Sequence, residues 1–468
     1  MNLKNQFTKT PFLVLFIVLI SIGVGTASAL TITLGGTVDI TQILNMMGNR
    51  ITNVGTPTQS SDAATKGYVD QSPTTDTLAS LGCSSDQIAR WDGVNWVCSD
   101  VSVISFHSIT LDIADSVGQY SSIAVGTDGF PVISYYDFTN DDLELVHCTN
   151  LSCSTTDPPV TLDSTGTVGR YTSIAIGSDG FPVISYYDAT NANLKLLHCT
   201  NVSCSTNSGP VTLALIDSVG EYTSIAIGTD GFPVISYYDS TNGDLKLVHC
   251  QNVVCGPNDP PVTLDSTGTV GLFTSIAIGS DGFPVISYYD STNGNLKLLH
   301  CTNISCSTNS GPITLDLTGD VGHFTSIAIG SDGFPVISYF DVTNTALKLV
   351  HCQNVVCGPN DPPVTLDSTG TVGLYSSIAI GSDGFPVVIY NDPVNADLKM
   401  VHCTNISCST NDPPVKVDSQ GSVGAHASLD LILNKFPVIS HLDQANGNLK
   451  FSVCSVQGDC IGSEVIFE

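Results

Sequence analysis

The chain repeats itself every 51 residues, and this feature limits its possible folds more than any other. The tetrapeptide Asp-Gly-Phe-Pro begins at six positions at that spacing, and a degenerate seventh copy, residues 434–437, keeps the step. The intact copies begin at Asp128, Asp179, Asp230, Asp281, Asp332 and Asp383. One unit contains four apolar segments of five to eight residues, separated by turn residues such as Gly, Asp and Asn. Each segment has the length of a β-strand, and none keeps a helical period over about ten residues.

Four short strands in a unit of about 50 residues are typical of a β-propeller blade, whereas helical repeats need a period of about 3.6 residues. We therefore predict an all-β fold, a seven-bladed β-propeller of four-stranded blades, over residues 101–468. Segments such as residues 174–176 and 182–184 are apolar on both faces, which fits sheets covered on both sides by neighbouring blades. Two segments compete for the strand that completes the ring, residues 108–113 before the first unit and residues 464–468 after the last.

The first 29 residues have the features of a secretory signal peptide. Two lysines precede an apolar stretch over residues 11–25, and Ala27-Ser28-Ala29 has the small-x-small pattern of a cleavage site. An uncleaved membrane anchor is the alternative, but the apolar stretch is shorter than the ~20 residues that span a bilayer. We expect a secreted or cell-surface protein with no membrane span after cleavage of residues 1–29.

Residues 30–100 lack the repeat, and we interpret them as a stalk. Residues 51–55 (ITNVG) and 62–70 (DAATKGYVD) resemble a short module of phage tail fibres and of bacterial surface proteins built on similar shafts. The resemblance covers about 20 residues and implies an elongated, often trimeric, stalk, so a homotrimer formed through the stalk is a hypothesis. Residues 81–98, which contain both tryptophans of the chain, look like a small disulfide-closed module seen beside such stalks.

Sixteen cysteines occur in close pairs, and their spacing predicts disulfides. Each unit carries Cys-x4-Cys, one residue wider in the last unit, and a further pair precedes the repeats. In a secreted chain such local pairs are typical of disulfides, and each closed loop stabilises the fold by roughly 2 kcal/mol. The predicted pairs are Cys83 with Cys98, Cys148 with Cys153, Cys199 with Cys204, Cys250 with Cys255, Cys301 with Cys306, Cys352 with Cys357, Cys403 with Cys408 and Cys454 with Cys460.

Metal sites are the alternative use of these cysteines, because a histidine directly precedes the first cysteine in six units. The histidines are His147, His198, His249, His300, His351 and His402. Adjacent residues on a strand point to opposite faces, so one ion cannot easily take both side chains. We predict that the histidines fill or flank the contact between blades. Calcium at residues 239–244 (DSTNGD) is disfavoured, because the segment lacks the alternating spacing of a calcium loop and is typical of a hairpin turn. We predict no metal and no cofactor.

Charge and the scarcity of arginine narrow the possible functions. The chain has 14 Lys+Arg against 43 Asp+Glu, a formal charge of -29, which argues against nucleic acid as a partner. The predicted propeller resembles sialidase-like and related bacterial or archaeal surface propellers in its short four-stranded repeats with an Asp-Gly turn. The Asp-box motif of those proteins, Ser-x-Asp-x-Gly-x-Thr-Trp, does not occur in this chain. Sialidases hold the substrate carboxylate with three arginines, whereas Arg170 is the only arginine in residues 101–468. Acids recur in every unit, whereas a catalytic residue should break the repeat, so we predict no catalytic residue and no enzyme.

One position in each unit varies while its surroundings repeat. Before each predicted first strand lies Val-Gly-x-aromatic, with His as the ring in the seventh copy. The residue x is in turn Gln119, Arg170, Glu221, Leu272, His323, Leu374 and Ala425, and the ring is Tyr120, Tyr171, Tyr222, Phe273, Phe324, Tyr375 and His426. Propeller loops of this kind share a face with the turns between second and third strands, where ligands commonly bind. The candidate ligand-binding residues are Gln119, Arg170, Glu221, Leu272 and His323 with Tyr120, Tyr171 and Tyr222. The alternative is an exposed loop position free to drift, with the aromatic residues packing between blades.

Together these patterns predict a recognition or adhesion module, secreted or at the cell surface, whose partner is a glycan or a surface protein. The first alternative is a structural surface or fibre component with no specific ligand. The second is a carbohydrate-active enzyme.

Overall fold

The computed structural model describes residues 106–454, except 115, 215–217, 257–259, 359–361 and 434, together with strands β1 (Gln87–Trp91) and β2 (Trp96–Asp100). The chain divides into two compact units, Met1–Val101 and Ser102–Glu468. In the first unit β1 and β2 pair as an antiparallel hairpin. The predicted signal peptide and the fibre-like module lie outside the described residues.

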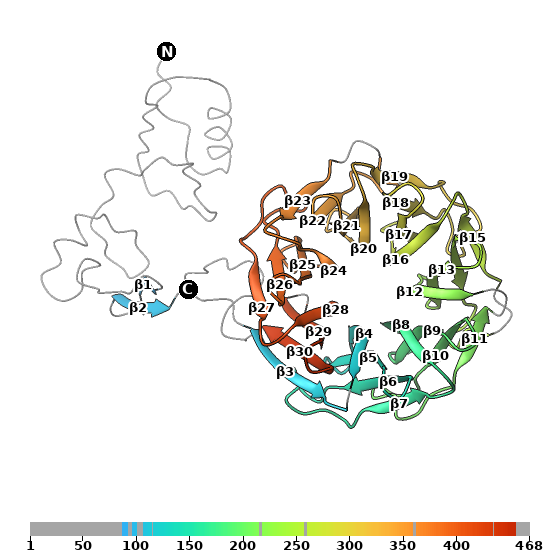
Figure 1. Ribbon diagram of the computed structural model, residues 1–468, viewed down its shortest axis with the longest axis horizontal. Coiled ribbons are helices and arrows are strands. Elements are labelled where there is room, and N and C mark those ends of the chain that lie inside the picture. Colours follow the sequence, from blue (N-terminus) through green and yellow to red (C-terminus); the bar gives the residue numbers. More distant parts are fainter. Residues whose placement is uncertain are drawn as a thin grey trace, which may run out of the picture. The chain divides into compact units, whose positions relative to one another are not determined.

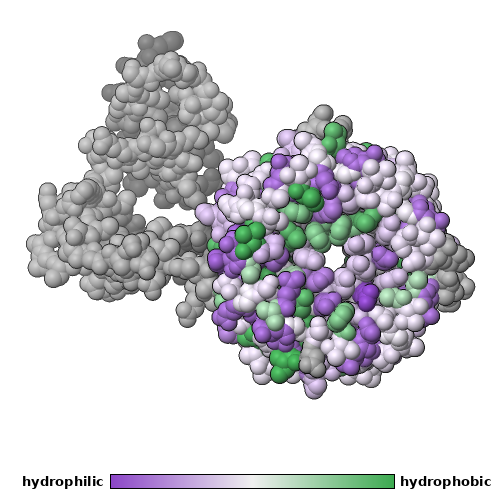
Figure 2. All heavy atoms as spheres, viewed as in Figure 1, coloured by the Kyte–Doolittle hydropathy of each residue, from purple (hydrophilic) through white to green (hydrophobic). Residues whose placement is uncertain are grey.

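Seven four-stranded antiparallel sheets form a ring around one axis, which confirms the predicted all-β, seven-bladed propeller (Figure 1). The described residues contain no helix. Figure 2 shows a hollow at the centre of the ring. The innermost strands, which number the blades 1 to 7 in chain order, are β4 (Val117–Val125), β8 (Val168–Ile176), β12 (Val219–Ile227), β16 (Val270–Ile278), β20 (Val321–Ile329), β24 (Leu374–Ile380) and β28 (Val423–Ile432).

The other strands follow outward in the same blade order. The second strands are β5 (Pro131–Asp137), β9 (Pro182–Asp188), β13 (Pro233–Asp239), β17 (Pro284–Asp290), β21 (Pro335–Asp341), β25 (Pro386–Asp392) and β29 (Phe436–Asp443). The third strands are β6 (Asp142–His147), β10 (Asn193–His198), β14 (Asp244–His249), β18 (Asn295–His300), β22 (Ala346–His351), β26 (Asp397–His402) and β30 (Asn448–Cys454). The outermost strands are β7 (Val160–Asp163), β11 (Val211–Ala214), β15 (Val262–Asp265), β19 (Ile313–Asp316), β23 (Val364–Asp367), β27 (Val415–Asp418) and, in blade 7, β3 (Phe106–Asp112).

The ring is closed by a strand from the N-terminal side of the repeats. Strand β3 pairs antiparallel with β30, from Phe106 opposite Cys454 to Asp112 opposite Leu449. This decides between the two candidate segments, because β3 supplies the outermost strand that blade 7 otherwise lacks. Residues 464–468 lie outside the described residues.

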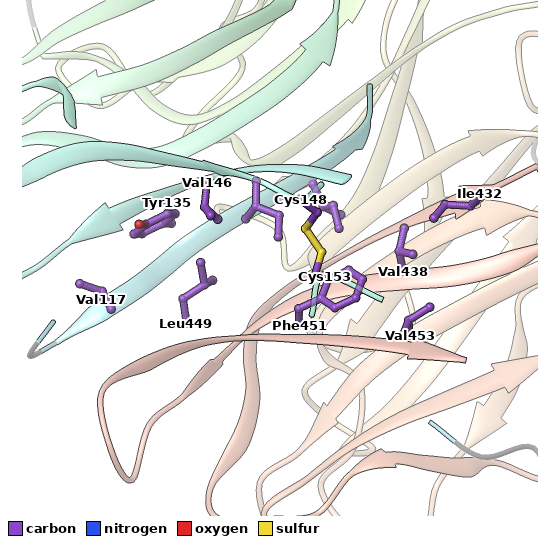
Figure 3. Close-up of a cluster of buried hydrophobic side chains, with 12 residues drawn as sticks. Val117, Tyr135, Val146, Cys148, Cys153, Ile432, Val438, Leu449, Phe451 and Val453 are labelled. Carbon is purple, nitrogen blue, oxygen red and sulfur yellow. A yellow bond between two sulfur atoms is a disulfide. The ribbon is translucent and has the colours of Figure 1, made fainter. Parts of the chain in front are cut away.

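Hydrophobic contact between blades forms the core. Every residue of the second strand β9 is buried, because blades cover its sheet on both sides. The junction between blades 7 and 1 is packed like the others, with Val117 and Tyr135 from blade 1 in one cluster with Leu449 and Phe451 from blade 7 (Figure 3). Each fully buried side chain of this size stabilises the fold by about 1.5–3 kcal/mol.

Hydrogen bonds around the axis add a second link between blades. The Ser122 hydroxyl of blade 1 accepts a bond from the Ile174 backbone N–H of blade 2 at 3.2 Å. The same bond recurs at every junction and closes the circle from Ser428 to the Ile123 backbone N–H at 3.3 Å. The other serines are Ser173, Ser224, Ser275, Ser326 and Ser377. Small residues on the innermost strands therefore let neighbouring backbones bond to side chains directly.

Six of the predicted disulfides are confirmed, one in each of the first six blades, with Cα atoms 4.6–5.0 Å apart. They join Cys148 to Cys153, Cys199 to Cys204, Cys250 to Cys255, Cys301 to Cys306, Cys352 to Cys357 and Cys403 to Cys408. The other two pairs stay predictions. Cys98 lies on β2, but its expected partner Cys83 lies outside the described residues. Likewise Cys454 ends β30, and its expected partner Cys460 lies outside them.

The histidines before these cysteines were predicted to fill or flank the contact between blades, but each bonds within its own blade. His198 Nε2, for example, lies 2.8 Å from Oδ2 of Asp179, the aspartate of the Asp-Gly turn in the same blade. The same contact recurs at the other five histidines. Each histidine thus ties the disulfide loop to the turn between the first two strands of its own blade, which corrects the expected contact between blades.

Candidate functional site

The Val-Gly-x-aromatic motif lies within the innermost strands, not before them as the sequence analysis expected. Strand β4 already begins at Val117, so Gln119 and Tyr120 belong to it. A β-bulge makes this possible, because Gln119 pairs with Tyr136 and Ser122 with Ser134, leaving one extra residue on the inner strand. In blade 6 the strand begins at Leu374, so that only the Val-Gly precedes it.

The aromatic residue of every motif has a left-handed backbone. Its φ is between 51° and 54° in all seven copies, for example 54° at Tyr171. Bulky residues are rare in this region, and each such backbone costs on the order of 1–3 kcal/mol. The preceding glycine is required by close approach, since a Cβ on Gly118 would lie 2.8 Å from the Leu449 Cα of the neighbouring blade.

The seven rings form a closed circle around the axis. Neighbouring ring centroids are 4.5–4.7 Å apart at all seven junctions, including 4.5 Å between His426 and Tyr120. They line a central pocket of about 210 Å³, with the next residue of each strand behind them. The structure thus brings the predicted Tyr120, Tyr171 and Tyr222 together with the rings of the other four units. We call these seven side chains the aromatic ring.

The hydroxyl groups behind the aromatic ring already have partners. Thr172, for example, lies 2.9 Å from the Ser134 hydroxyl of the preceding blade. Ser376 donates to the Phe324 backbone carbonyl at 2.8 Å, and Ser121 donates to that of His426 at 2.9 Å. The polar groups that the pocket offers are therefore mainly those of the aromatic ring itself.

The varied residues x surround the aromatic ring and are not exposed. Gln119, Arg170, Glu221, Leu272, His323 and Leu374 are half-buried, and Ala425 is fully buried. Two of them make specific contacts with the second strand of the preceding blade. A freely drifting loop position would have neither the burial nor these contacts.

Arg170 belongs to the first of two local clusters at these positions. Its guanidinium carbon lies 5.4 Å from the centroid of the Tyr136 ring. The Tyr136 hydroxyl donates to the Asp141 carboxylate. Burial and this hydrogen bond raise the pKa of Tyr136 to about 12. Asp141 is unique among the units, which have Ala, Gly or Thr at its position.

His323 belongs to the second cluster. Its ring centroid is 4.1 Å from that of Tyr289, and its Nε2 lies 3.1 Å from Asp320 Oδ1. The Tyr289 hydroxyl donates to the same oxygen at 2.6 Å. Asp320 is also unique, because the other units have Ser or Thr before the Val-Gly. Asp141 and Asp320 were not among the predicted site residues, although each breaks the repeat at its position. Comparing every position across the units, not only x, would have found them.

Asp430 is a third singular residue that sequence reasoning missed. It replaces an alanine present in the other six units, on the innermost strand of blade 7. Its carboxylate accepts the Val125 backbone N–H of blade 1 at 2.8 Å and its neighbour's N–H, that of Leu431, at 2.7 Å. Burial raises the pKa of Asp430. The residue therefore joins the last blade to the first.

The acidic turns are held by local bonds. The Asp239 carboxylate accepts the backbone N–H groups of Thr241 and Asn242, each at 3.1 Å, and pairs with Lys246. This is the hairpin geometry that the sequence favoured over a calcium loop. Within the part of the chain that the structure describes, no group of three or more His, Cys, Asp or Glu side chains is placed to hold a metal ion. The described residues also contain no helix long and apolar enough to cross a membrane.

A larger hollow of about 380 Å³ lies away from the axis, lined by residues that include Asp367, Lys399 and Pro414. Asp367 and Lys399 lie 3.7 Å apart and belong to a lysine–aspartate pairing that recurs between other blades. Since no singular residue marks this hollow, the central pocket with its varied surroundings is the better candidate site.

No family model and no curated protein matches the chain. Solved structures that are similar to it include a protein of unknown function from Dyadobacter fermentans, 11% identical, with a TM-score of 0.50, covering 76% of this chain and 100% of that one. Another is a "putative 6-phosphogluconolactonase" from Bacteroides uniformis, 9% identical, with a TM-score of 0.44, covering 64% of this chain and 85% of that one. At these identities the likeness shows the fold alone.

The prediction that the protein is not an enzyme was wrong as stated. A solved structure similar to this chain carries the description of a lactonase. One fold hosts many functions, so the fold by itself does not exclude catalysis. The likeness is too distant to bring that activity to this chain. The propeller fold alone therefore does not settle whether the chain is an enzyme.

Proposed function

We propose that the protein is a recognition module, secreted or at the cell surface, which binds a glycan or a surface protein on the propeller face around the aromatic ring. The observation that carries this proposal is the closed circle of seven aromatic side chains on left-handed backbones around the central pocket. Strained backbone is retained where the surrounding structure has a use for it, and such sites cluster at functional positions.

The two local clusters support the same face as the site. Arg170 occurs with Asp141 and His323 occurs with Asp320, and in each pair both residues are unique to their unit. Each pair meets at a tyrosine of the preceding blade. Paired singular residues make the face asymmetric, as recognition of one specific ligand requires.

The proposed location rests on the cysteines. Six disulfides persist in an oxidising compartment and are rare in the cytosol. The predicted signal peptide agrees with this location, and the fibre-like stalk of residues 30–100 would present the propeller away from the surface, as a homotrimer where the stalk trimerises.

A structural surface component is the second candidate function. Residues 250–272 and 352–374 are identical in sequence, which fits recent duplication of units for expansion as well as for binding. In that case the residue type at x would differ between units without any ligand that contacts it.

A binding screen of the full chain against glycans and surface proteins separates the two candidates. We expect Arg170→Ala and His323→Ala to weaken binding at least tenfold, and Glu221→Ala to change it. Leu151→Ala, in the disulfide loop at the other end of the blades, is the control and should leave binding unchanged. Absence of any ligand, or binding that ignores all three face substitutions, would favour the structural candidate. Turnover of a bound sugar would show a catalytic role instead.

A further inference from the structure

The aromatic ring has a definite orientation, which limits its ligands. The planes of neighbouring rings make angles of 45–59°. One seventh of a full turn is about 51°, so each plane is related to the next mainly by rotation about the propeller axis. Rings lying flat across the axis would instead be nearly parallel to one another. The seven planes therefore stand upright, along the axis.

The spacing then shows that ring edges, not faces, point at the axis. Seven centroids about 4.6 Å apart in a regular circle lie about 5.3 Å from its centre. If the faces pointed inward, the edge carbons of neighbouring rings would be about 2 Å apart, far inside the contact distance of ~3.5 Å. The rings must overlap, each covering part of the face of the next. An aromatic cage for a cation needs open faces, so the ring does not offer one.

Four of the seven side chains that line the central pocket in this circle are tyrosines. Burial raises the pKa of Tyr375, and Tyr120 and Tyr222, two and three blades away, raise it further. Burial also raises the pKa of Tyr171, and the neighbouring Tyr222 raises it further. The hydroxyl groups of these tyrosines therefore lie close enough to act on one another around the pocket that their side chains line. Among the described residues, the Tyr120 and Tyr375 hydroxyls have no hydrogen-bond partner, so they are available to a ligand.

The pocket is uncharged and its surroundings are acidic. Burial lowers the pKa of His426 to about 4, so its ring is neutral at pH 7. Arg170 is the only lysine or arginine among the varied positions, and it lies over Tyr136 beside Asp141. Glu221 and Asp320 add negative charge near the pocket. An anionic ligand would therefore meet repulsion without a free cation to bind it.

We propose that the mouth of the central pocket takes the terminal residue of a neutral glycan, whose hydroxyl-bearing edge is held by hydrogen bonds to the tyrosine hydroxyls rather than by stacking on aromatic faces. This inference rests on the proposed recognition function and names its ligand class. A phenol both donates and accepts, as sugar hydroxyls do. Phe273 and Phe324 make the opposite side apolar, which suits the C–H groups of a sugar ring. The volume of about 210 Å³ is below the ~300 Å³ of a typical small-molecule site and suits one terminal residue.

The test uses the full oxidised chain and saturation-transfer NMR. The probes are the methyl glycosides of glucose, galactose, mannose and N-acetylglucosamine, with glucuronate, galacturonate and sialic acid as acidic counterparts. We expect at least one neutral glycoside to bind and the acidic sugars to bind at least tenfold more weakly. Tyr120→Phe and Tyr375→Phe keep the rings and remove one available hydroxyl each, and each should weaken neutral binding about three- to tenfold.

Tyr237→Phe is the matched control, because the Tyr237 hydroxyl is buried without a hydrogen-bond partner among the described residues. It should leave both folding and binding unchanged. Thermal unfolding of each variant checks that the ring is intact. Preference for acidic sugars, or neutral binding that ignores Tyr120→Phe and Tyr375→Phe, would overturn this inference. Binding of a surface protein without any sugar would overturn it too, while the recognition function stands. If neither sugar nor protein binds, both proposals fail.

Discussion

Replacing Glu144 by lysine should stabilise the junction between blades 7 and 1. In the other six blades a lysine occupies this place on the third strand. Lys195 shows its role, since its Nζ lies 3.0 Å from both Asp163 and Asp188 and so joins two blades. Among the residues that the structure describes, no such cation lies beside Glu144. Burial raises its pKa, and the charges of Asp112 and Asp137 raise it further.

The expected gain follows from these contacts. Two opposite charges about 4 Å apart attract by roughly 4 kcal/mol at an effective dielectric constant of about 20. Removing water from the ammonium group offsets most of this, so we expect Glu144→Lys to raise the free energy of unfolding by about 1–3 kcal/mol at pH 7. For a domain of this size the midpoint of thermal unfolding should rise by about 1–4 °C. Circular dichroism during heating and in urea measures both quantities.

The pH dependence of the stabilisation by Glu144→Lys gives a second test of its electrostatic cause. Because the folded-state pKa of Glu144 is raised, its ionised form opposes folding, and this penalty disappears as pH falls through the folded-state pKa. The advantage of Glu144→Lys over the natural chain should therefore shrink on acidification. Lys195→Glu is the matched control and should lower stability at a junction that now has its lysine. A Glu144→Lys variant no more stable at pH 7, or an advantage that grows in acid, would refute the reasoning.

Two further predictions concern the loops and the strained backbone. Replacing both Cys199 and Cys204 by serine should lower the free energy of unfolding, measured by urea titration, by about 2 kcal/mol. Added reductant should then lower the stability of this variant less than that of the natural chain. At position 171, whose φ is 54°, Tyr171→Gly should be more stable than Tyr171→Ala by about 1 kcal/mol, because only glycine adopts this backbone without strain. Equal stability of the two variants would show that the backbone relaxes instead.

The fold was predictable because the repeat leaves little choice. Four apolar strand-length segments in each of seven units can cover both faces of their sheets only against each other. The closing strand was not predictable, since residues 108–113 and 464–468 carry similar patterns. The bulge was hidden as well, because Val-Gly before an aromatic residue is typical of a turn. Only pairing on both sides of Tyr120 shows that the strand continues through it.

The candidate site was predictable in part. The position x and the aromatic residue stood out because one varied and the other recurred. The residues that contact them could not be predicted, because contacts between blades join residues far apart in the chain. Tyr289 and Asp320, for example, are 31 residues apart. The role of the histidines was also beyond a local pattern. His198 bonds to an aspartate 19 residues earlier, a distance set by how the second and third strands fold back.

Because β3 closes the ring, its pairing with β30 is the part of the propeller that a mechanical force on the preceding chain would separate first. Tension that reaches the propeller from the preceding chain passes first into the backbone pairing of β3 with β30. If that pairing yields, blade 7 loses one edge while the six blades from β4 to β27 keep all their strands. Six complete blades would then stand beside a three-stranded blade 7, to which β3 can pair again.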